Sequence, residues 1–154
     1  MYRPLWSEQI LEEMAKALKT KLNRSTEEIA WRRHQMNEAF GEAIVPVPPE
    51  LLKSVECIPD VDDRHVLAAA IMAHANTIVT QNTKHFPKEC LEKYGVLCQT
   101  ADDFLVHQYH LCPQLVLDKL DDQGIGISQN RAFVIKTLSK AAPEFCKYVG
   151  AHLM

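Results

Sequence analysis

Three carboxylates stand close together, immediately before an alanine-rich segment that has the composition of a helix. These acids are Asp60, Asp62 and Asp63, and the helical segment covers residues 64–74. Carboxylate oxygens are the ligands that Mg²⁺ and Mn²⁺ prefer, and such an ion can activate water and neutralise a phosphate oxygen. The acids therefore predict a metal site suited to phosphodiester hydrolysis at the start of this helix.

Asp63 is the best single candidate for a metal ligand, because it stands where the helix dipole favours an anion. The alternative is that Asp63, or Asp62 in its place, is only the N-cap of the helix, a role worth about 1 kcal/mol. Asp60 lies on the approach to the helix. It could bind the metal through water, or it could only solvate a turn.

A second pair of polar candidates follows the apolar strand predicted at residues 77–80. The amide oxygen of Asn82 could coordinate Mg²⁺ or orient a ligand water without adding charge, and the hydroxyl of Thr80 could hold a carboxylate. Open α/β sheets place their chemistry at this end of a strand. Both residue types also favour an ordinary turn after a strand, and that alternative stays open.

A further acid comes from the first predicted helix. Glu13 borders the apolar stripe of Ile10, Met14 and Leu18, where a side chain can reach the edge of a sheet. The alternative for one glutamate on a helix is simple solvation at the surface.

Cationic side chains provide candidate contacts to nucleic acid. Arg32, Arg33 and Lys84 could bind phosphate oxygens, and Trp31 beside the two arginines could stack on a base. The alternative is a solvated helix face on which Trp31 is partly buried. The histidines, by contrast, do not have the spacing that zinc sites favour.

Bulk properties restrict the protein class. A chain of 154 residues with net charge −3 can bury a real core, and its charge argues against a general nucleic-acid coat. Five cysteines without a C-x-x-C pair predict buried, reduced thiols in a cytoplasmic protein. No apolar run approaches the roughly 20 residues of a membrane span, so no membrane association is expected.

Hydrophobic periodicity and capping residues predict an α/β protein. Helices are expected from Ser7 and Ser25, where Ser25 and Glu28 form a capping box, and after Pro48. Strands are expected at residues 43–47, 77–80 and 96–98, with a helix at 88–94 between the last two. Such βαβ-like order predicts a mostly parallel sheet of three or four strands.

Residues beyond Thr100 are expected to be helical. Asp102 and Asp103 are predicted to cap one helix, residues 121–126 to form a turn, and residues 132–140 and 143–152 to form a helical pair. We therefore expect an α/β domain at residues 1–110 and a helical extension at residues 111–154, packed on the same domain.

Five segments occur in an order and spacing that resemble those of the PIN-domain nucleases, in particular the VapC-like bacterial toxins. They are Trp6–Glu13, Asp60–Ala70, Ile78–Asn82, His85–Pro87 and Ala101–Leu105. The resemblance implies an α/β three-layer sandwich with a mostly parallel sheet, helices on both faces and a C-terminal helical extension.

The resemblance also implies an activity: an Mg²⁺- or Mn²⁺-dependent endoribonuclease, the toxin of a toxin–antitoxin pair. RNA would be its substrate and an antitoxin its partner. Asp63 and Glu13 match family positions that would bind the metal, and Asp60 could join them. Asn82 stands where the family carries Asp or Asn and would complete the catalytic group, and Thr80 would orient the ligands.

One part of the family pattern has no counterpart here. In the family, a strand ending in Asp precedes the segment that resembles Trp6–Glu13, but Met1 stands five residues before Trp6. Without this strand, sheet positions would be left unpaired, so we expect a complementing strand that carries an Asp. It could be supplied by an antitoxin or other protein, by an upstream segment, or by exchange in a homodimer. The alternative is a catalytically incomplete PIN-like domain that acts as a protein-binding module.

Overall fold

The computed structural model describes residues 2–151, which divide into two compact units. The N-terminal unit comprises residues 2–78 and 84–98, and the C-terminal unit comprises residues 79–83 and 99–151. The predicted division at residue 110 stays a prediction. None of the helices within residues 2–151 has the length and hydropathy that a membrane crossing requires.

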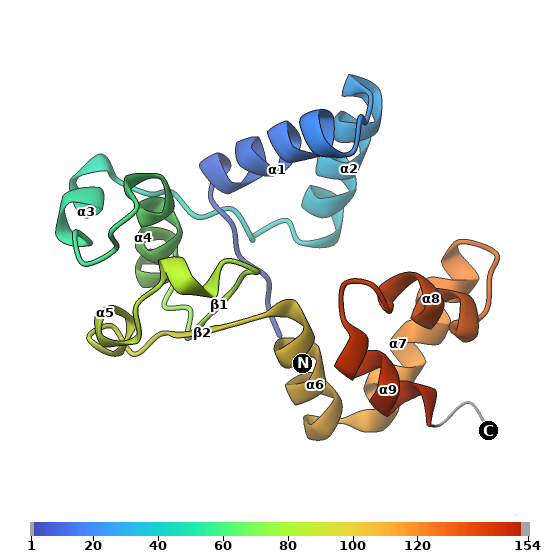
Figure 1. The fold of residues 1–154 in the computed structure, drawn as a ribbon. Coiled ribbons are helices and arrows are strands. Elements are labelled where there is room, and N and C mark those ends of the chain that lie inside the picture. The colour runs from blue at the N-terminus through green and yellow to red at the C-terminus, as the bar shows by residue number, and fades with distance from the viewer. Residues whose placement is uncertain (1, 152–154) are drawn as a thin grey trace. The chain divides into compact units, whose positions relative to one another are not determined.

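The N-terminal unit begins with a helical hairpin (Figure 1). The N-cap of each of its two helices bonds to a residue three positions later. The Ser7 hydroxyl accepts a hydrogen bond from the backbone N–H of Ile10, and the predicted capping box between Ser25 and Glu28 is confirmed. The helices of this unit are α1 (Glu8–Lys21), α2 (Thr26–Ala39), α3 (Pro49–Ser54), α4 (Arg64–Met72) and α5 (Lys88–Glu92), with the 3₁₀ turn η1 (Val61–Asp63) before α4.

The sheet is smaller than expected. Strands β1 (Thr77–Val79) and β2 (Leu97–Gln99) pair, and backbone bonds from Leu97 to Asn76 and from Thr80 to Gln99 give them parallel register. The strand predicted at residues 43–47 is reduced to one parallel bridge between Ile44 and Trp6. The α/β class is confirmed, but the described residues form a two-stranded sheet instead of one with three or four strands.

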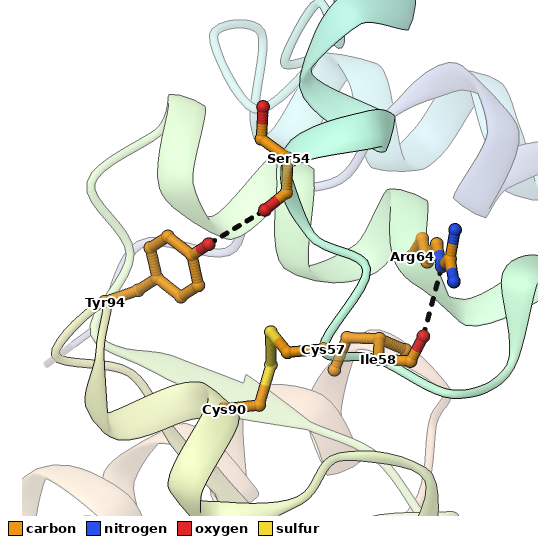
Figure 2. Close-up of a disulfide and its surroundings, with 6 residues drawn as sticks. All are labelled: Ser54, Cys57, Ile58, Arg64, Cys90 and Tyr94. Atoms are coloured by element: carbon orange, nitrogen blue, oxygen red, sulfur yellow. Dashed lines mark hydrogen bonds between the residues drawn. A yellow bond between two sulfur atoms is a disulfide. The ribbon is translucent and has the colours of Figure 1, made fainter.

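A disulfide joins two cysteines of the N-terminal unit, which contradicts the prediction that all thiols are reduced. Cys57 follows α3 and Cys90 lies in α5, and their Cα atoms are 5.5 Å apart, within the reach of a disulfide (Figure 2). The hydroxyl of Tyr94 donates to the carbonyl of Ser54 across the same gap. The core around them includes Ile58, Leu67, Ile78, Phe86 and Leu91. The sequence could not reveal this pairing, because packing brings the two cysteines together.

The C-terminal unit is mainly helical (Figure 1), and its buried side chains form a separate hydrophobic core. The helices are α6 (Ala101–Leu111), α7 (Pro113–Gly126), α8 (Arg131–Leu138) and α9 (Pro143–Gly150). The predicted helical pair is thus confirmed as α8 and α9. His152, at the end of the predicted range, lies outside the described residues.

The turn predicted at residues 121–126 is wrong, because α7 continues through them. Gly124 lies where the chain turns back toward α8, and a Cβ on it would come 2.9 Å from the carbonyl oxygen of Gln129. Asp121 pairs with Arg131 at the start of α8, and this hydrogen bond lowers the pKa of the Asp121 carboxyl. The glycine therefore allows a close approach of the chain after the helix, and it does not end the helix.

The predicted cap of α6 is also corrected. Thr100 is the N-cap of α6, since its hydroxyl accepts from the backbone N–H of Asp103. The carboxylate of Asp102 instead accepts the backbone N–H groups of Glu144 and Phe145, at 3.0 and 2.8 Å, and so caps the first turn of α9.

Replacing Asp102 by alanine is expected to lower the free energy of unfolding by about 1–2 kcal/mol, because two N–H groups of α9 lose a charged acceptor. Urea unfolding followed by circular dichroism measures this loss. Asp102→Asn keeps one acceptor oxygen and should lose less. An unchanged unfolding midpoint in the alanine variant would contradict the capping role.

Candidate metal centre

Asp63 occupies the position before α4, yet its side chain makes no capping hydrogen bond within residues 2–151. An N-cap side chain turns back onto the helix from an extended backbone, whereas Asp63 has φ −93° and ψ −9° because η1 leads directly into α4. Its carboxylate instead contacts the imidazole of His85, with 2.5 Å between Oδ2 and Nδ1. The alternative that Asp63 only caps the helix is therefore wrong.

Asp60 adds a second carboxylate to this pair. Its Oδ1 accepts from the backbone N–H of Asp62 at 3.0 Å and so caps η1. Its Oδ2 lies 3.8 Å from Nδ1 of His85. Asp60 therefore both solvates a turn and presents an oxygen to the group around Asp63.

One ligand atom from each of Asp60, Asp63 and His85 lies within 4.8 Å of the others. Donors bound at about 2.1 Å around an octahedral ion are about 3 Å apart when adjacent and about 4.2 Å apart when opposite. Nδ1 of His85 lies 2.5 Å from Oδ2 of Asp63 and 3.8 Å from Oδ2 of Asp60, so the contact with Asp63 must lengthen for both groups to bind one ion. The donor set therefore fits a divalent cation in type and in spacing.

The segment that carries these acids is held from two sides. Arg64, the first residue of α4, donates from Nε to the carbonyl of Ile58 at 3.1 Å, and Cys57 next to Ile58 is tied to α5 (Figure 2). These contacts fix both ends of the turn that contains Asp60 and Asp63.

Glu13 reaches the start of α4 through a buried histidine. Nε2 of His65 lies 2.9 Å from Oε1 of Glu13, a close contact that does not have the geometry of a hydrogen bond. His65 is 3% exposed, and its Nδ1 has no hydrogen-bond partner among the described residues. Because His65 is two residues from Asp63, the contact brings α1 and α4 together at the end of α4 that carries the acids.

Thr80 and Asn82 lie in the C-terminal unit and form a turn after β1. The Thr80 hydroxyl accepts from the backbone N–H of Asn82 at 3.1 Å. This is the strand-end turn that both residue types favour. The hydroxyl proton of Thr80 and the side-chain amide of Asn82 take no part in this hydrogen bond. The ligand-orienting role of Thr80 and the catalytic role of Asn82 stay predictions.

The side chains predicted to contact RNA differ in their exposure and in their contacts within the protein. Arg33 forms an ion pair with Glu8 between α2 and α1, so part of its charge is used within the hairpin. Trp31 is 64% exposed, and with Arg32 it lines a shallow surface depression. The expectation that Trp31 is partly buried is therefore wrong. Lys84 lies in the 3₁₀ turn η2 (Thr83–His85) next to the acids' partner His85.

Sequence reasoning did not assign His65 and His85 to the site. The histidines lack the sequence spacing that zinc sites favour, and this criterion cannot detect a histidine that meets distant acids only in the folded chain. Two sequence positions could have indicated these residues. His65 follows Asp63 by two residues, and His85 directly precedes Phe86, an aromatic residue that the structure buries.

Comparison with known proteins agrees with the resemblance seen in sequence. The profile of the PIN domain family matches residues 1–84. A stretch of 49 residues is 51% identical to VapC50 of Mycobacterium tuberculosis, which is named as a candidate ribonuclease. The stretch makes up 32% of this chain and 29% of that protein, so the chain spans less than a third of its relative. No solved structure matches. Because the family profile covers more than half of the sequence, the chain belongs to the PIN domain family.

Proposed function

We propose that the chain is a divalent-metal-dependent endoribonuclease and the toxin of a toxin–antitoxin pair. The observation that carries the proposal is the carboxylate of Asp63, which is not used as a helix cap and converges with Asp60 and His85. Membership of the PIN domain family and the similarity to VapC50 support the same activity. The proposal includes a cytoplasmic location, where cellular RNA is found.

Each residue has a stated task in this proposal. Asp63 and Asp60 hold the ion, and Glu13 supplies a further carboxylate near the start of α4, oriented by His65. When bound, Mg²⁺ or Mn²⁺ supplies a Lewis acid for a phosphate oxygen and lowers the pKa of a ligand water. Asn82 and Thr80 keep the catalytic and ligand-orienting tasks expected from sequence, and Arg32, Arg33 and Lys84 bind RNA phosphates.

The proposal further includes a complementing strand that carries an Asp. A two-stranded sheet has little stability by itself, and β1 and β2 each have one edge to which a strand could add. An additional carboxylate would raise the negative charge around the ion beyond that of Asp60, Asp63 and Glu13. The strand would come from an antitoxin or other partner, from an upstream segment, or from a second copy.

RNA cleavage tests this function directly. The chain is purified alone and together with the products of the upstream and adjacent reading frames, and each preparation is incubated with RNA and Mg²⁺ or Mn²⁺. We expect cleavage by a complemented form and its loss with EDTA, because the ion activates the water. If no preparation cleaves RNA while a partner still binds, the protein-binding alternative is correct.

A further inference from the structure

We propose that His85 is a metal ligand, and that its imidazole makes the centre favour Mn²⁺ and later first-row ions over Mg²⁺. The inference rests on the proposed metal dependence, and it identifies a ligand and a class of ion that the nuclease proposal leaves open.

The first argument is geometric. A single nitrogen of His85, Nδ1, faces both carboxylates, at 2.5 Å from Asp63 Oδ2 and 3.8 Å from Asp60 Oδ2. One N–H group can donate a linear hydrogen bond to only one of these oxygens. The three donor atoms lie within 4.8 Å of one another, close enough for one ion to bind all three, and such an ion would take the place of the direct contact between His85 and Asp63.

The second argument is that the backbone presents His85 to the acids. His85 ends the 3₁₀ turn η2, and the next residue, Phe86, is 5% exposed within the hydrophobic core around Leu67 and Ile78. The imidazole itself remains 43% exposed. A buried anchor beside a half-exposed imidazole holds the ring in place and leaves it open to an ion from solvent.

The third argument is chemical. Mg²⁺ prefers oxygen ligands and gives up its water reluctantly, whereas imidazole is a good ligand for later transition ions, whose affinities rise from Mn²⁺ to Ni²⁺. Two carboxylates from Asp60 and Asp63 neutralise the charge of the ion, so a neutral imidazole adds selectivity without adding charge. The donor set therefore predicts affinities in the order Mg²⁺ below Mn²⁺ below Co²⁺ below Ni²⁺.

The test measures binding and coordination, not cleavage. The full chain is titrated with Mn²⁺, and bound Mn²⁺ is examined by pulsed electron paramagnetic resonance for coupling to ¹⁴N. We expect nitrogen coupling in the wild type and its loss in His85→Gln. The Kd for Mn²⁺ should rise about tenfold, in the range seen when groups that support a metal are removed, while the Kd for Mg²⁺, measured by competition, changes less than about twofold. His110→Gln, an exposed histidine in α6, is the matched control and should behave as wild type.

Several outcomes overturn the inference. Bound Mn²⁺ without nitrogen coupling in the wild type would make His85 only an ion-pair partner of Asp63, and this measurement needs no variant. Coupling that persists in folded His85→Gln would assign the nitrogen to another histidine, such as His65. Absence of Mn²⁺ binding would remove the site altogether. RNA cleavage is scored separately. Nitrogen coupling without cleavage would contradict the proposed nuclease function and support His85 as a ligand. Cleavage without nitrogen coupling would support the nuclease function and contradict His85 as a ligand.

Discussion

Asp63→Asn is expected to abolish RNA cleavage by the complemented protein, with a loss of about 100-fold or more, while the chain stays folded. The carboxylate lies at the centre of the donor group with Asp60 and His85, and the amide removes the negative charge that holds the ion. Stability should change by less than about 1 kcal/mol, because the side chain makes no capping bond to α4 within the described chain and its partner His85 is half-exposed, where such pairs contribute little. Cleavage assays and urea unfolding on the same preparations measure the two effects.

Asp62→Asn is the matched control, with the same chemical change one residue away. Asp62 belongs to the same acidic run, but its side chain is not among the converging ligands. We expect near wild-type cleavage and Mn²⁺ affinity for this variant. Equal cleavage by Asp63→Asn and wild type would show that the wrong acid has been assigned.

Reduction of the Cys57–Cys90 disulfide is expected to lower the free energy of unfolding by about 3–4 kcal/mol. The bond closes a loop of 33 residues in sequence separation, and opening such a loop restores this much conformational freedom to the unfolded chain. Domains of this size have total stabilities of about 5–15 kcal/mol, so the loss is a large fraction of the total. Urea unfolding with and without a reductant measures it.

The double variant Cys57→Ala/Cys90→Ala provides the control for the reductant. It should unfold at lower urea than the oxidised wild type, and a reductant should then have no further effect. Burial raises the pKa of the Cys98 and Cys146 thiols and makes them poor nucleophiles. Cys112 is exposed, so it is replaced by alanine in all the preparations that are compared. If the oxidised and reduced wild type unfold at the same urea concentration, the two cysteines do not form a stabilising bond.

The redox result also bears on the metal centre. Cys57 adjoins Ile58, whose carbonyl accepts from Arg64 at the start of α4 (Figure 2). Disulfides are rare in reducing compartments, so a cytoplasmic form of the chain would contain the thiols at these positions. The Mn²⁺ titration should therefore be carried out under both conditions.

The amino-acid sequence by itself determined most of the local elements, and it identified the family. The caps at Ser7 and Ser25 join groups three residues apart, and the start of α4 and the pairing strands follow from apolar patterns in short windows. The acids of the candidate centre were also found in this way, because the family motif is a run of neighbouring residues. Such features can be predicted because they depend on residues that are close together in the sequence.

Tertiary structure alone decided which side chains meet. Asp63 and His85 are 22 residues apart, Cys57 and Cys90 are 33 apart, and Asp102 caps a helix that begins more than 40 residues later. Glu13 and His65 come from different helices. The physical reason is that a hydrogen bond or disulfide between distant residues depends on how helices pack around a core, and no periodicity or capping rule within a short segment contains that information.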